Sequence, residues 1–313
     1  MLAAVLELGV AEALGDEAVP LPDLAARLGT SPTDLRRLLR AARAAGLFRE
    51  EPPGWVSHSP ASALLRSGGL RDEARHVLSR WTRIAWDGLE HSVRTGTSGF
   101  VHATGRSVFD YLRDHPDEAE VFHAFQAEVA RRGLPALLAS GCLPTSGTVV
   151  DVGGGEGALL AALLEAAPRL RGTLLDLPEV IARVRRPELG GRLRLAAGDF
   201  FRDVPAGADT YLLSHVLHDW PDTSAARILE RVAAAAAPTS RIVVIENVRP
   251  PEGSSLLLAY LDLQMLAAWE GRERTIDEYR VLLRGAGLAL TEARLVDPRG
   301  GLTVLTGTPE KSS

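Results

Sequence analysis

The pattern of hydrophobic and polar positions changes near residue 145. Before that point apolar residues recur with a helical period. In residues 21–48 one face carries Leu35, Leu38, Leu39 and Ala42. Ser31 and Pro32 are typical of an N-cap and of the first position of a helix. The pattern predicts a helical N-terminal domain that covers residues 1–140.

From residue 147 onward, continuous apolar runs alternate with helical stretches. Such runs are typical of strands that are buried on both faces of a parallel sheet. The last two runs are joined only by a short turn, so we expect them to pair antiparallel. The seven runs are residues 147–152, 172–177, 192–198, 209–214, 241–248, 288–296 and 302–308. Residues 141–313 are therefore predicted to form an α/β domain with a doubly wound, seven-stranded, mostly parallel sheet and a C-terminal antiparallel hairpin.

The N-terminal helices, followed by a hairpin-like stretch at residues 49–60, resemble a winged helix-turn-helix. DNA binding would require a dense basic surface. Between Pro22 and Arg66 there are seven basic and four acidic residues, without a basic stripe. The sequence favours a packing or dimerisation domain over a DNA-binding one.

Composition excludes several classes of protein. The net charge of −5 argues against nucleic acid and anionic membrane as partners. A single cysteine, Cys142, permits no internal disulfide and suits the cytoplasm. The only lysine is Lys311, near the end of the chain, which argues against a Schiff-base or phosphate-loop lysine. No apolar run approaches the roughly 18 residues of a membrane span, and the first residues lack a basic leader, so we expect a cytoplasmic protein.

A glycine-rich turn follows the first predicted strand. Gly153, Gly155 and Gly157 have a G-x-G-x-G spacing, and Asp151 ends the strand before them. Glycines allow a nucleotide to approach the backbone at a helix N-terminus. The carboxylates of Asp151 and Glu156 crowd this turn, which favours a cationic or zwitterionic ligand over a pyrophosphate.

Acidic residues also follow the next two predicted strands. Asp176 is placed where a carboxylate accepts the hydroxyl groups of a ribose. Asp199 is placed to accept from an adenine amino group, with Phe200 packed against the ring. Together with the glycine turn, these residues predict a nucleoside cofactor.

The stretch "SHVLHDWPD", residues 214–222, places two histidines three residues apart. On the residues alone, two interpretations remain open. His215 and His218 could bind a metal ion together with Asp219 or Asp222. Alternatively, a histidine could be a general base, because a neutral imidazole with a pKa of about 6.5 accepts a proton near neutral pH.

The motifs "DVGGGEG", "LLDLP", "GDFF", "HDWPD" and "GRERT" occur in this order along the chain. With them, the chain resembles the class I S-adenosyl-methionine-dependent methyltransferases. More narrowly, it resembles the O-methyltransferase family that includes plant caffeate-type enzymes and bacterial tailoring enzymes of aromatic polyketide and antibiotic pathways. The likeness extends over nearly the whole chain. It implies S-adenosyl-methionine as the cofactor, no metal, no DNA binding, and a winged-helix domain that forms a homodimer and covers the partner's active site.

The resemblance also implies roles for individual residues. Gly153 and Gly155 would hold the methionine portion of the cofactor, Asp176 its ribose, and Asp199 with Phe200 its adenine. Further cofactor contacts are expected from Asp151, Leu177, Ser214 and Trp220. The catalytic residues would be His218 as general base, Glu246 and Glu273 as flanking carboxylates, and Asp219, which orients the loop or the substrate. His215 is expected to have a structural or cofactor-side role.

The chain departs from the family pattern at two places. Ser214 stands where many relatives carry lysine, and Glu270 replaces the first glycine of the usual pair before "ERT". We expect both changes to bear on cofactor or substrate binding. The predicted substrate pocket is formed by Met265, Leu266 and Trp269, with contributions from residues 80–130.

The predicted function is methylation of a phenolic or other aromatic hydroxyl group of a small bacterial secondary metabolite. One alternative is a family member that binds the cofactor but catalyses hydroxylation or another reaction without methyl transfer. The retained His218, Glu246 and Glu273 argue against it. A second alternative, a winged-helix regulator that senses a metabolite, is disfavoured by the weak basic surface.

Overall fold

The computed structural model describes residues 1–185 and 187–310. Two compact units are present: residues 1–83 with 115–125, and residues 84–114 with those from 126 onward. Each unit is described by itself, and the domain boundary near residue 140 stays a prediction. Among the described residues, none of the helices combines the length and the apolar character needed to cross a bilayer.

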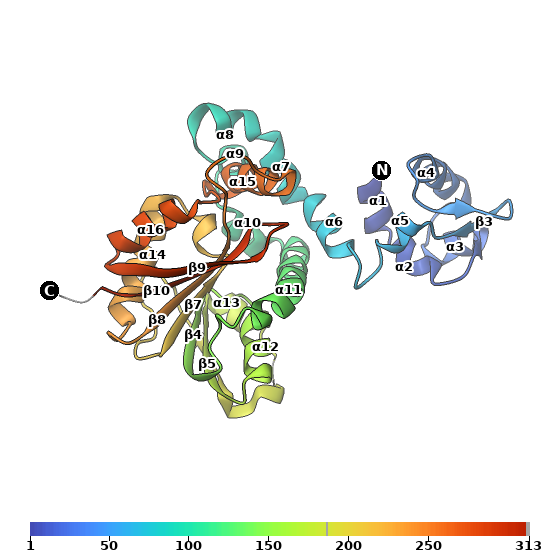
Figure 1. The fold of residues 1–313 in the computed structure, drawn as a ribbon. Helices are drawn as coiled ribbons and strands as arrows, with labels where there is room; N and C mark the ends of the chain where they lie inside the picture. The colour runs from blue at the N-terminus through green and yellow to red at the C-terminus, as the bar shows by residue number, and fades with distance from the viewer. Residues whose placement is uncertain (186, 311–313) are drawn as a thin grey trace. The chain divides into compact units, whose positions relative to one another are not determined.

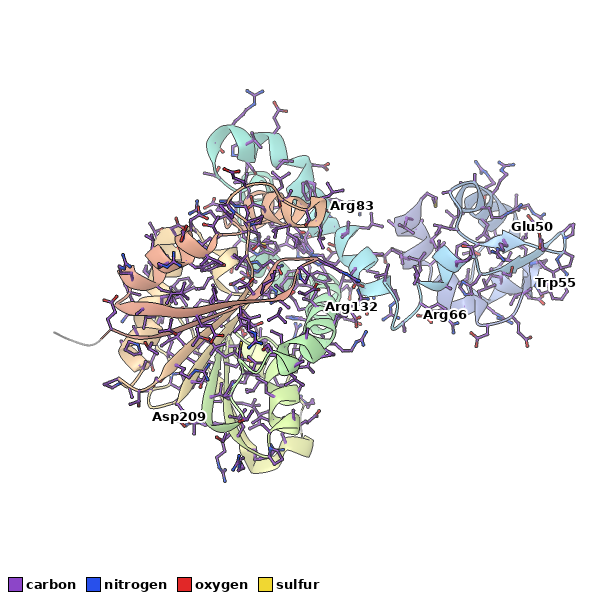
Figure 2. The ribbon with its side chains drawn as sticks, viewed as in Figure 1. Glu50, Trp55, Arg66, Arg83, Arg132 and Asp209 are labelled. Atoms are coloured by element: carbon purple, nitrogen blue, oxygen red, sulfur yellow. The ribbon has the colours of Figure 1, made fainter. Side chains whose placement is uncertain are left out.

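The first unit combines short helices with a small antiparallel sheet (Figure 1). Its helices are α1 (Leu2–Glu7), α2 (Val10–Leu14), α3 (Leu21–Arg27), α4 (Pro32–Ala44), α5 (Pro60–Ala63) and α6 (Arg71–Val77). Its strands are β1 (Val19–Pro20), β2 (Arg49–Glu50) and β3 (Trp55–Ser57), in the order β1-β3-β2. In Figure 2, Trp55 and Glu50 mark the β2–β3 hairpin. The helical winged-helix-like prediction is confirmed.

Helix α4 illustrates why the sequence folds this way locally. The Ser31 hydroxyl accepts a hydrogen bond from the Asp34 amide at 3.4 Å, and Pro32 is the first helical residue, as predicted. Three of the four residues of the predicted apolar face are buried in the core of this unit, and Leu38 is partly buried against it. The amphipathic pattern therefore predicts correctly which face of α4 is buried.

The second unit contains a seven-stranded sheet in the described residues (Figure 1). The strands are β4 (Ser146–Val152), β5 (Arg169–Asp176), β6 (Leu193–Ala197), β7 (Thr210–Ser214), β8 (Arg241–Asn247), β9 (Leu288–Asp297) and β10 (Leu302–Pro309). The order is β6-β5-β4-β7-β8-β10-β9. The pairs from β6 to β8 are parallel, whereas β10 runs antiparallel to both β8 and β9. The predicted sheet and terminal hairpin are confirmed.

Two apolar cores lie against the sheet, and the strands supply both. In β7, Tyr211 and Leu213 belong to one core and Leu212 to the other. In β8, Val243 and Val244 divide in the same way. Because alternate side chains of a strand point to opposite faces, a sheet covered on both faces requires continuous apolar runs.

Helices and helical turns join these strands. They are α12 (Ala158–Ala166), α13 (Pro178–Ile181), η1 (Pro187–Arg192), η2 (Leu217–Asp219), α14 (Asp222–Ala235), α15 (Leu256–Trp269) and α16 (Ile276–Gly285). The helices that precede the sheet in sequence are α7 (Arg80–Asp87), α8 (Leu89–Thr95), α9 (Gly99–Thr104), α10 (Val108–Asp114) and α11 (Pro116–Ala139).

Helices α8 and α9 make a close backbone contact that depends on two glycines. A Cβ atom on Gly99 would lie 2.4 Å from the carbonyl oxygen of Gly88, and a Cβ on Gly88 would lie 2.6 Å from the Cα of Gly99. Beside this contact, the Gly99 amide donates to Ser92 Oγ at 2.8 Å. Both glycines are therefore required by close packing.

We expect Gly99→Ala to lower the free energy of unfolding by about 1–3 kcal/mol, because the added methyl group forces the two backbones apart. Thermal denaturation of the purified variant measures this. Gly285→Ala is the matched control: its Cβ would meet open space at the end of α16, where alanine favours the helix. Equal melting temperatures for wild type and Gly99→Ala would contradict the prediction.

Candidate active site

The candidate site lies where five parallel strands end. Strands β5 and β6 lie on one side of β4, and β7 and β8 lie on the other. The order of the chain therefore reverses between β4 and β7. Open α/β sheets bind ligands at such a switch point, beyond the carboxyl ends of the strands.

The glycine turn after β4 has the backbone that its sequence predicts. Gly153 and Gly155 have φ angles of 70° and 60°, a left-handed conformation that few other residues adopt. A Cβ on Gly153 would also lie 3.1 Å from the ring of Phe200 and 3.2 Å from Val216. The Gly155 amide donates to Asp176 Oδ2 at 2.8 Å, so the turn is tied to the end of β5.

Asp151 is a buried carboxyl beneath this turn. Only 1% of it is exposed, and neither carboxyl oxygen has a hydrogen-bond partner among the described residues. Burial, with the nearby charge of Asp176, raises its pKa to about 7. A buried carboxyl without a partner is costly, and a cationic ligand group would offset that cost. The site thus fits a ligand with an ammonium group.

Asp176 and Leu177 lie at the end of β5. Asp176 Oδ1 accepts from the Leu177 amide at 2.7 Å, and Leu177 is the N-cap residue of α13. Burial raises the pKa of Asp176 to about 6, and the two amide donors oppose this shift. Each carboxylate oxygen keeps a further lone pair, so Asp176 can still accept ligand hydroxyl groups.

Asp199 and Phe200 follow β6. Asp199 Oδ1 accepts from the Phe201 amide at 2.8 Å, which fixes the turn. The rings of Phe200 and Phe201 both approach Trp220 edge-on, with centroids at 6.2 and 4.8 Å. The structure therefore brings the predicted adenine-binding residues close to Trp220.

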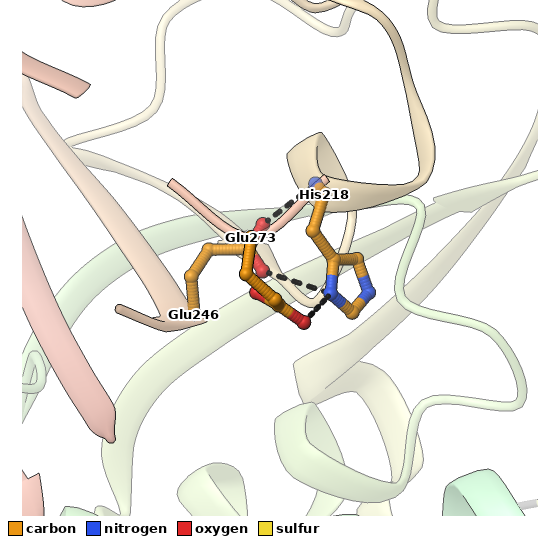
Figure 3. A group of neighbouring side chains, drawn as sticks. All are labelled: His218, Glu246 and Glu273. Atoms are coloured by element: carbon orange, nitrogen blue, oxygen red, sulfur yellow. Dashed lines mark hydrogen bonds and ion pairs between the residues drawn. The ribbon is translucent and has the colours of Figure 1, made fainter. Parts of the chain in front are cut away.

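His218 lies in η2 beside two buried glutamates (Figure 3). Its Nδ1 is 3.1 Å from Glu273 Oε1 and 3.6 Å from Glu246 Oε2. Its Nε2 is 3.5 Å from Asp219 Oδ1. Glu246 is held in place because its Oε1 accepts from the Leu217 amide at 2.8 Å. The four predicted catalytic residues are thus brought together.

The charges of His218 and the neighbouring carboxylates shift one another's pKa values. Burial lowers the pKa of His218, but the charges of Glu246, Glu273 and Asp219 outweigh it and raise that pKa to about 10. Burial raises the pKa of Glu246 to about 7 and that of Asp219 to about 6, and the charge of His218 opposes both shifts. The surrounding carboxylates therefore strongly favour the imidazolium form of His218.

The residues that could bind a metal ion in the structure differ from the set that the sequence suggested. Ligand atoms of His218, Glu246 and Glu273 lie within 4.8 Å of one another, a separation at which one ion could bind all three. However, His218 Nδ1 already forms a hydrogen bond with Glu273, and a metal would have to replace it. Asp222 instead forms ion pairs at 2.8 Å with Arg272 and Arg274. That no metal is required stays a prediction.

Ser214 and His215 form a pair of their own. Ser214 Oγ is 3.2 Å from His215 Nδ1, and His215 has a left-handed backbone with φ of 53°. Burial, together with the charge of His218, lowers the pKa of His215 to about 3. His215 is therefore neutral over the ordinary pH range, and its ring faces that of His218 edge-on, with centroids 5.6 Å apart.

The residues predicted to contact substrate lie on the last turns of α15. Met265 is buried, and Leu266 and Trp269 are partly buried. The Phe109 ring approaches both Trp269 and Trp220, with ring centroids 6.4 and 6.2 Å away. The sequence favoured a core position for Phe109 over a ligand contact, because helical segments carry no motif that marks a ligand contact.

Glu270 has a role that the sequence did not suggest. It ends α15 with a left-handed φ of 65°, and its carboxylate accepts from the Ser98 amide at 3.1 Å. The Ser98 hydroxyl lies 3.1 and 2.8 Å from the carbonyl oxygens of Ala267 and Ala268. Glu270 thus ties the start of α9 to the end of α15.

Comparison with known proteins gives two family matches. A model described as the O-methyltransferase domain matches residues 86–289, and one described as the O-methyltransferase dimerisation domain matches residues 1–68. Among curated proteins, the chain is similar to phenazine O-methyltransferase PhzM of Lysobacter antibioticus. The two are 34% identical over 311 residues, which cover 97% of this chain and 90% of that protein.

Solved structures agree with these matches. Mitomycin 7-O-methyltransferase MmcR superposes with a TM-score of 0.91 at 34% identity, over 98% of this chain and 93% of that one. NcsB1, an O-methyltransferase from neocarzinostatin biosynthesis, superposes with a TM-score of 0.85 at 31% identity, over 98% and 94%. The NcsB1 structure contains S-adenosylmethionine and 2-hydroxy-5-methyl naphthoic acid.

The buried carboxyl of Asp151 generates a prediction about stability. The pKa of Asp151 is raised from 3.8 to about 7 in the folded state. The folded protein therefore binds this proton more tightly than the unfolded chain does. The resulting stabilisation is complete below pH 3.8 and is lost as the pH rises through about 7. Asp151→Asn removes the buried charge but keeps the shape. We expect it to raise the melting temperature of the ligand-free protein at about pH 8, and to raise it less at about pH 5.

Asp209 provides a control of opposite sign, directly before the amino end of β7 (Figure 2). Hydrogen bonds from Thr148 lower the pKa of Asp209, so its carboxylate stabilises the fold. We expect Asp209→Asn to lower the melting temperature at both pH values. A melting temperature of Asp151→Asn at or below that of wild type at the higher pH would contradict the interpretation of Asp151.

Proposed function

The chain belongs to the S-adenosyl-methionine-dependent O-methyltransferases that carry a dimerisation domain, and from this premise we propose that it methylates a phenolic or other aromatic hydroxyl group of a small bacterial secondary metabolite, with His218 as general base. The dimerisation domain indicates a homodimer. The similar proteins include phenazine O-methyltransferase PhzM of Lysobacter antibioticus and mitomycin 7-O-methyltransferase MmcR, which supports the substrate class.

The arrangement of His218 and Glu273 carries this proposal. Glu273 Oε1 faces Nδ1 at 3.1 Å, so the Nδ1 proton is directed at a carboxylate. That contact leaves Nε2 as the nitrogen that can accept a proton from a substrate. A base whose second nitrogen is held by a carboxylate has a defined tautomer and orientation, and the charge that develops on it is stabilised.

A phenol is a weak nucleophile at neutral pH, because its pKa is near 10, like that of tyrosine. The carboxylates raise the pKa of His218 to about 10, close to that of a phenol. Proton transfer from the hydroxyl group to Nε2 is then nearly balanced in free energy. The same carboxylates keep a proton on the resting imidazole, so this proton must leave before Nε2 can accept another.

The residues after β4, β5 and β6 fit the cofactor. Gly153 and Gly155 would let its methionine portion approach the backbone. The carboxylate of Asp151 would balance the positive charge of its ammonium group. Asp176 and Leu177 would meet the ribose, with Asp199 and Phe200 at the adenine. When bound, the cofactor supplies an electrophilic methyl group on a sulfonium sulfur. Trp220 and Ser214 complete the proposed contacts.

The aromatic residues around Trp220, two residues after His218, support an aromatic substrate. Trp269 and Phe109 lie close together, and Met265 adds a flexible apolar side chain that fills irregular space. The Glu270 carboxylate is engaged with the Ser98 amide, so we do not assign it to substrate recognition. Its effect on a ligand would be exerted through the position of the segment that follows α15.

The proposal is tested with cofactor that carries a labelled methyl group and with a panel of hydroxylated phenazines, naphthoates and benzoates. We expect label in at least one phenol, and the same rate after treatment with EDTA. Stoichiometric binding of the cofactor without transfer to any phenol would favour the alternative, a family member that catalyses a reaction other than methyl transfer. Loss of activity in EDTA, restored by a divalent metal, would overturn the metal-free prediction.

His218→Asn tests the base directly. We expect kcat to fall by about 10²-fold near neutral pH, because no group accepts the hydroxyl proton. The loss should shrink with a more acidic fluorinated phenol, which ionises without a base. Wild-type kcat should rise with pH toward about 10, since the raised pKa keeps His218 protonated below that value.

The control is His215→Asn, in which asparagine tolerates the left-handed backbone. We expect it to change kcat by less than about tenfold. The general-base proposal would be falsified if His218→Asn methylated a phenol at the wild-type rate, or if its deficit were the same for acidic and ordinary phenols.

A further inference from the structure

The backbone of the η2 turn is held by the segment that follows α15. The Arg272 amide donates to the carbonyl oxygen of His218 at 2.9 Å. A Cβ on Gly271 would lie 1.9 Å from that same oxygen, so the two backbones are in direct contact. This segment therefore supplies both the Glu273 carboxylate and the surface on which the His218 turn rests.

One side chain of the segment grips the turn on both sides of His218. Arg274 Nη1 donates to the carbonyl oxygen of Leu217 at 2.7 Å, and Nη2 donates to that of Trp220 at 2.7 Å. These two carbonyl groups bracket His218 and Asp219. The planar guanidinium offers its donors in a rigid fork, so one side chain fixes both distances at once.

Arg274 is fully buried, which is unusual for a charged side chain. Its Nε donates to Asp222 Oδ1 at 2.9 Å, and its guanidinium carbon lies 5.9 Å from the centre of the Tyr279 ring. The carboxylate that balances its charge is half exposed, at 53%. Of the three carboxylates around His218, none forms an ion pair with Arg274 in the described structure. The contacts of Arg274 thus serve mainly the backbone of the turn.

We propose that Arg274 is a positioning residue for methyl transfer. By clamping the carbonyl oxygens of Leu217 and Trp220, it holds the His218 imidazole against the carboxylates of Glu273 and Glu246. The proposal rests on the proposed role of His218 as general base. It goes further by naming the side chain that keeps the base in place without contact with the reacting atoms.

The first test measures His218 itself, without cofactor or substrate. Imidazole nitrogen signals are followed by NMR as a function of pH in wild type and Arg274→Lys, with His218→Asn used to assign the signal. Lysine keeps the charge but cannot bridge two carbonyl groups in a fixed fork. We expect the midpoint of the His218 titration to fall by about one pH unit, because the carboxylates that raise it are no longer held at the same distance.

The second test separates kcat from KM. At a pH above the His218 titration midpoint, where the imidazole is neutral in both proteins, we expect Arg274→Lys to lower kcat by about tenfold or more. The KM of the cofactor should change less than about threefold, since the turn carries the base and not the glycine loop. The control is Arg249→Gln. The Arg249 amide donates to the carbonyl oxygen of Arg274, but its guanidinium reaches Glu278 and not the η2 turn. We expect this control to match wild type in both measurements.

If Arg274→Lys does not fold, Asp222→Asn replaces it, because this change frees the guanidinium from its carboxylate and should produce smaller shifts of the same sign. A folded Arg274→Lys with an unchanged His218 titration and an unchanged kcat would overturn the proposal. If His218→Asn retained wild-type activity while Arg274→Lys moved the His218 titration, the general base would be refuted and the clamp would stand. The two hypotheses therefore fail separately.

Discussion

The site depends on the burial of one imidazole among three carboxylates. Placing ions in a protein interior costs several kcal/mol each unless charges and hydrogen bonds compensate. His218 supplies the only basic side chain in direct contact with Asp219, Glu246 and Glu273 among the described residues. Backbone donors supply part of the remainder, since the Leu217 and His218 amides both point at Glu246. The fold must therefore bring η2, the end of β8 and the segment before α16 together, or leave these charges uncompensated.

The same constraint explains the close packing around the turn. Gly271 allows two backbones to touch at His218, and Arg274 holds the carbonyl groups on either side. Reactive geometry is commonly set by such supporting groups and not by the reacting side chain alone. The carboxyl group at the glycine loop is not compensated in this way. Asp151 has no hydrogen-bond partner in the described structure, so a cationic ligand can interact with it.

The sequence predicted the sheet well because both of its faces are covered. Continuous apolar runs such as β7 and β8 have few other uses in a globular protein, and the short turn before β10 left antiparallel pairing as the simple outcome. His218, Glu246 and Glu273 were predicted through the family motifs, and the structure brings them together over long sequence distances. Their roles stay predictions.

Other features could not be predicted, because they depend on contacts between distant segments. Arg274 was quoted within a motif but carried no signal that its guanidinium would bracket residues 217–220. The Glu270 carboxylate was expected near substrate, yet it reaches the amide of Ser98, 172 residues away in the chain. Neither periodicity nor composition predicts which backbone amide a carboxylate will accept a hydrogen bond from.

That last contact fastens the start of α9 to the segment that carries Glu273. Ser98 is fastened to the final turn of α15 through its amide and its hydroxyl, and Glu273 lies only a few residues beyond that turn. A displacement of α9 would therefore be transmitted toward the carboxylate that faces Nδ1 of His218. The His218 imidazole thus lies at the end of a chain of direct contacts that begins at α9, more than a hundred residues away in sequence.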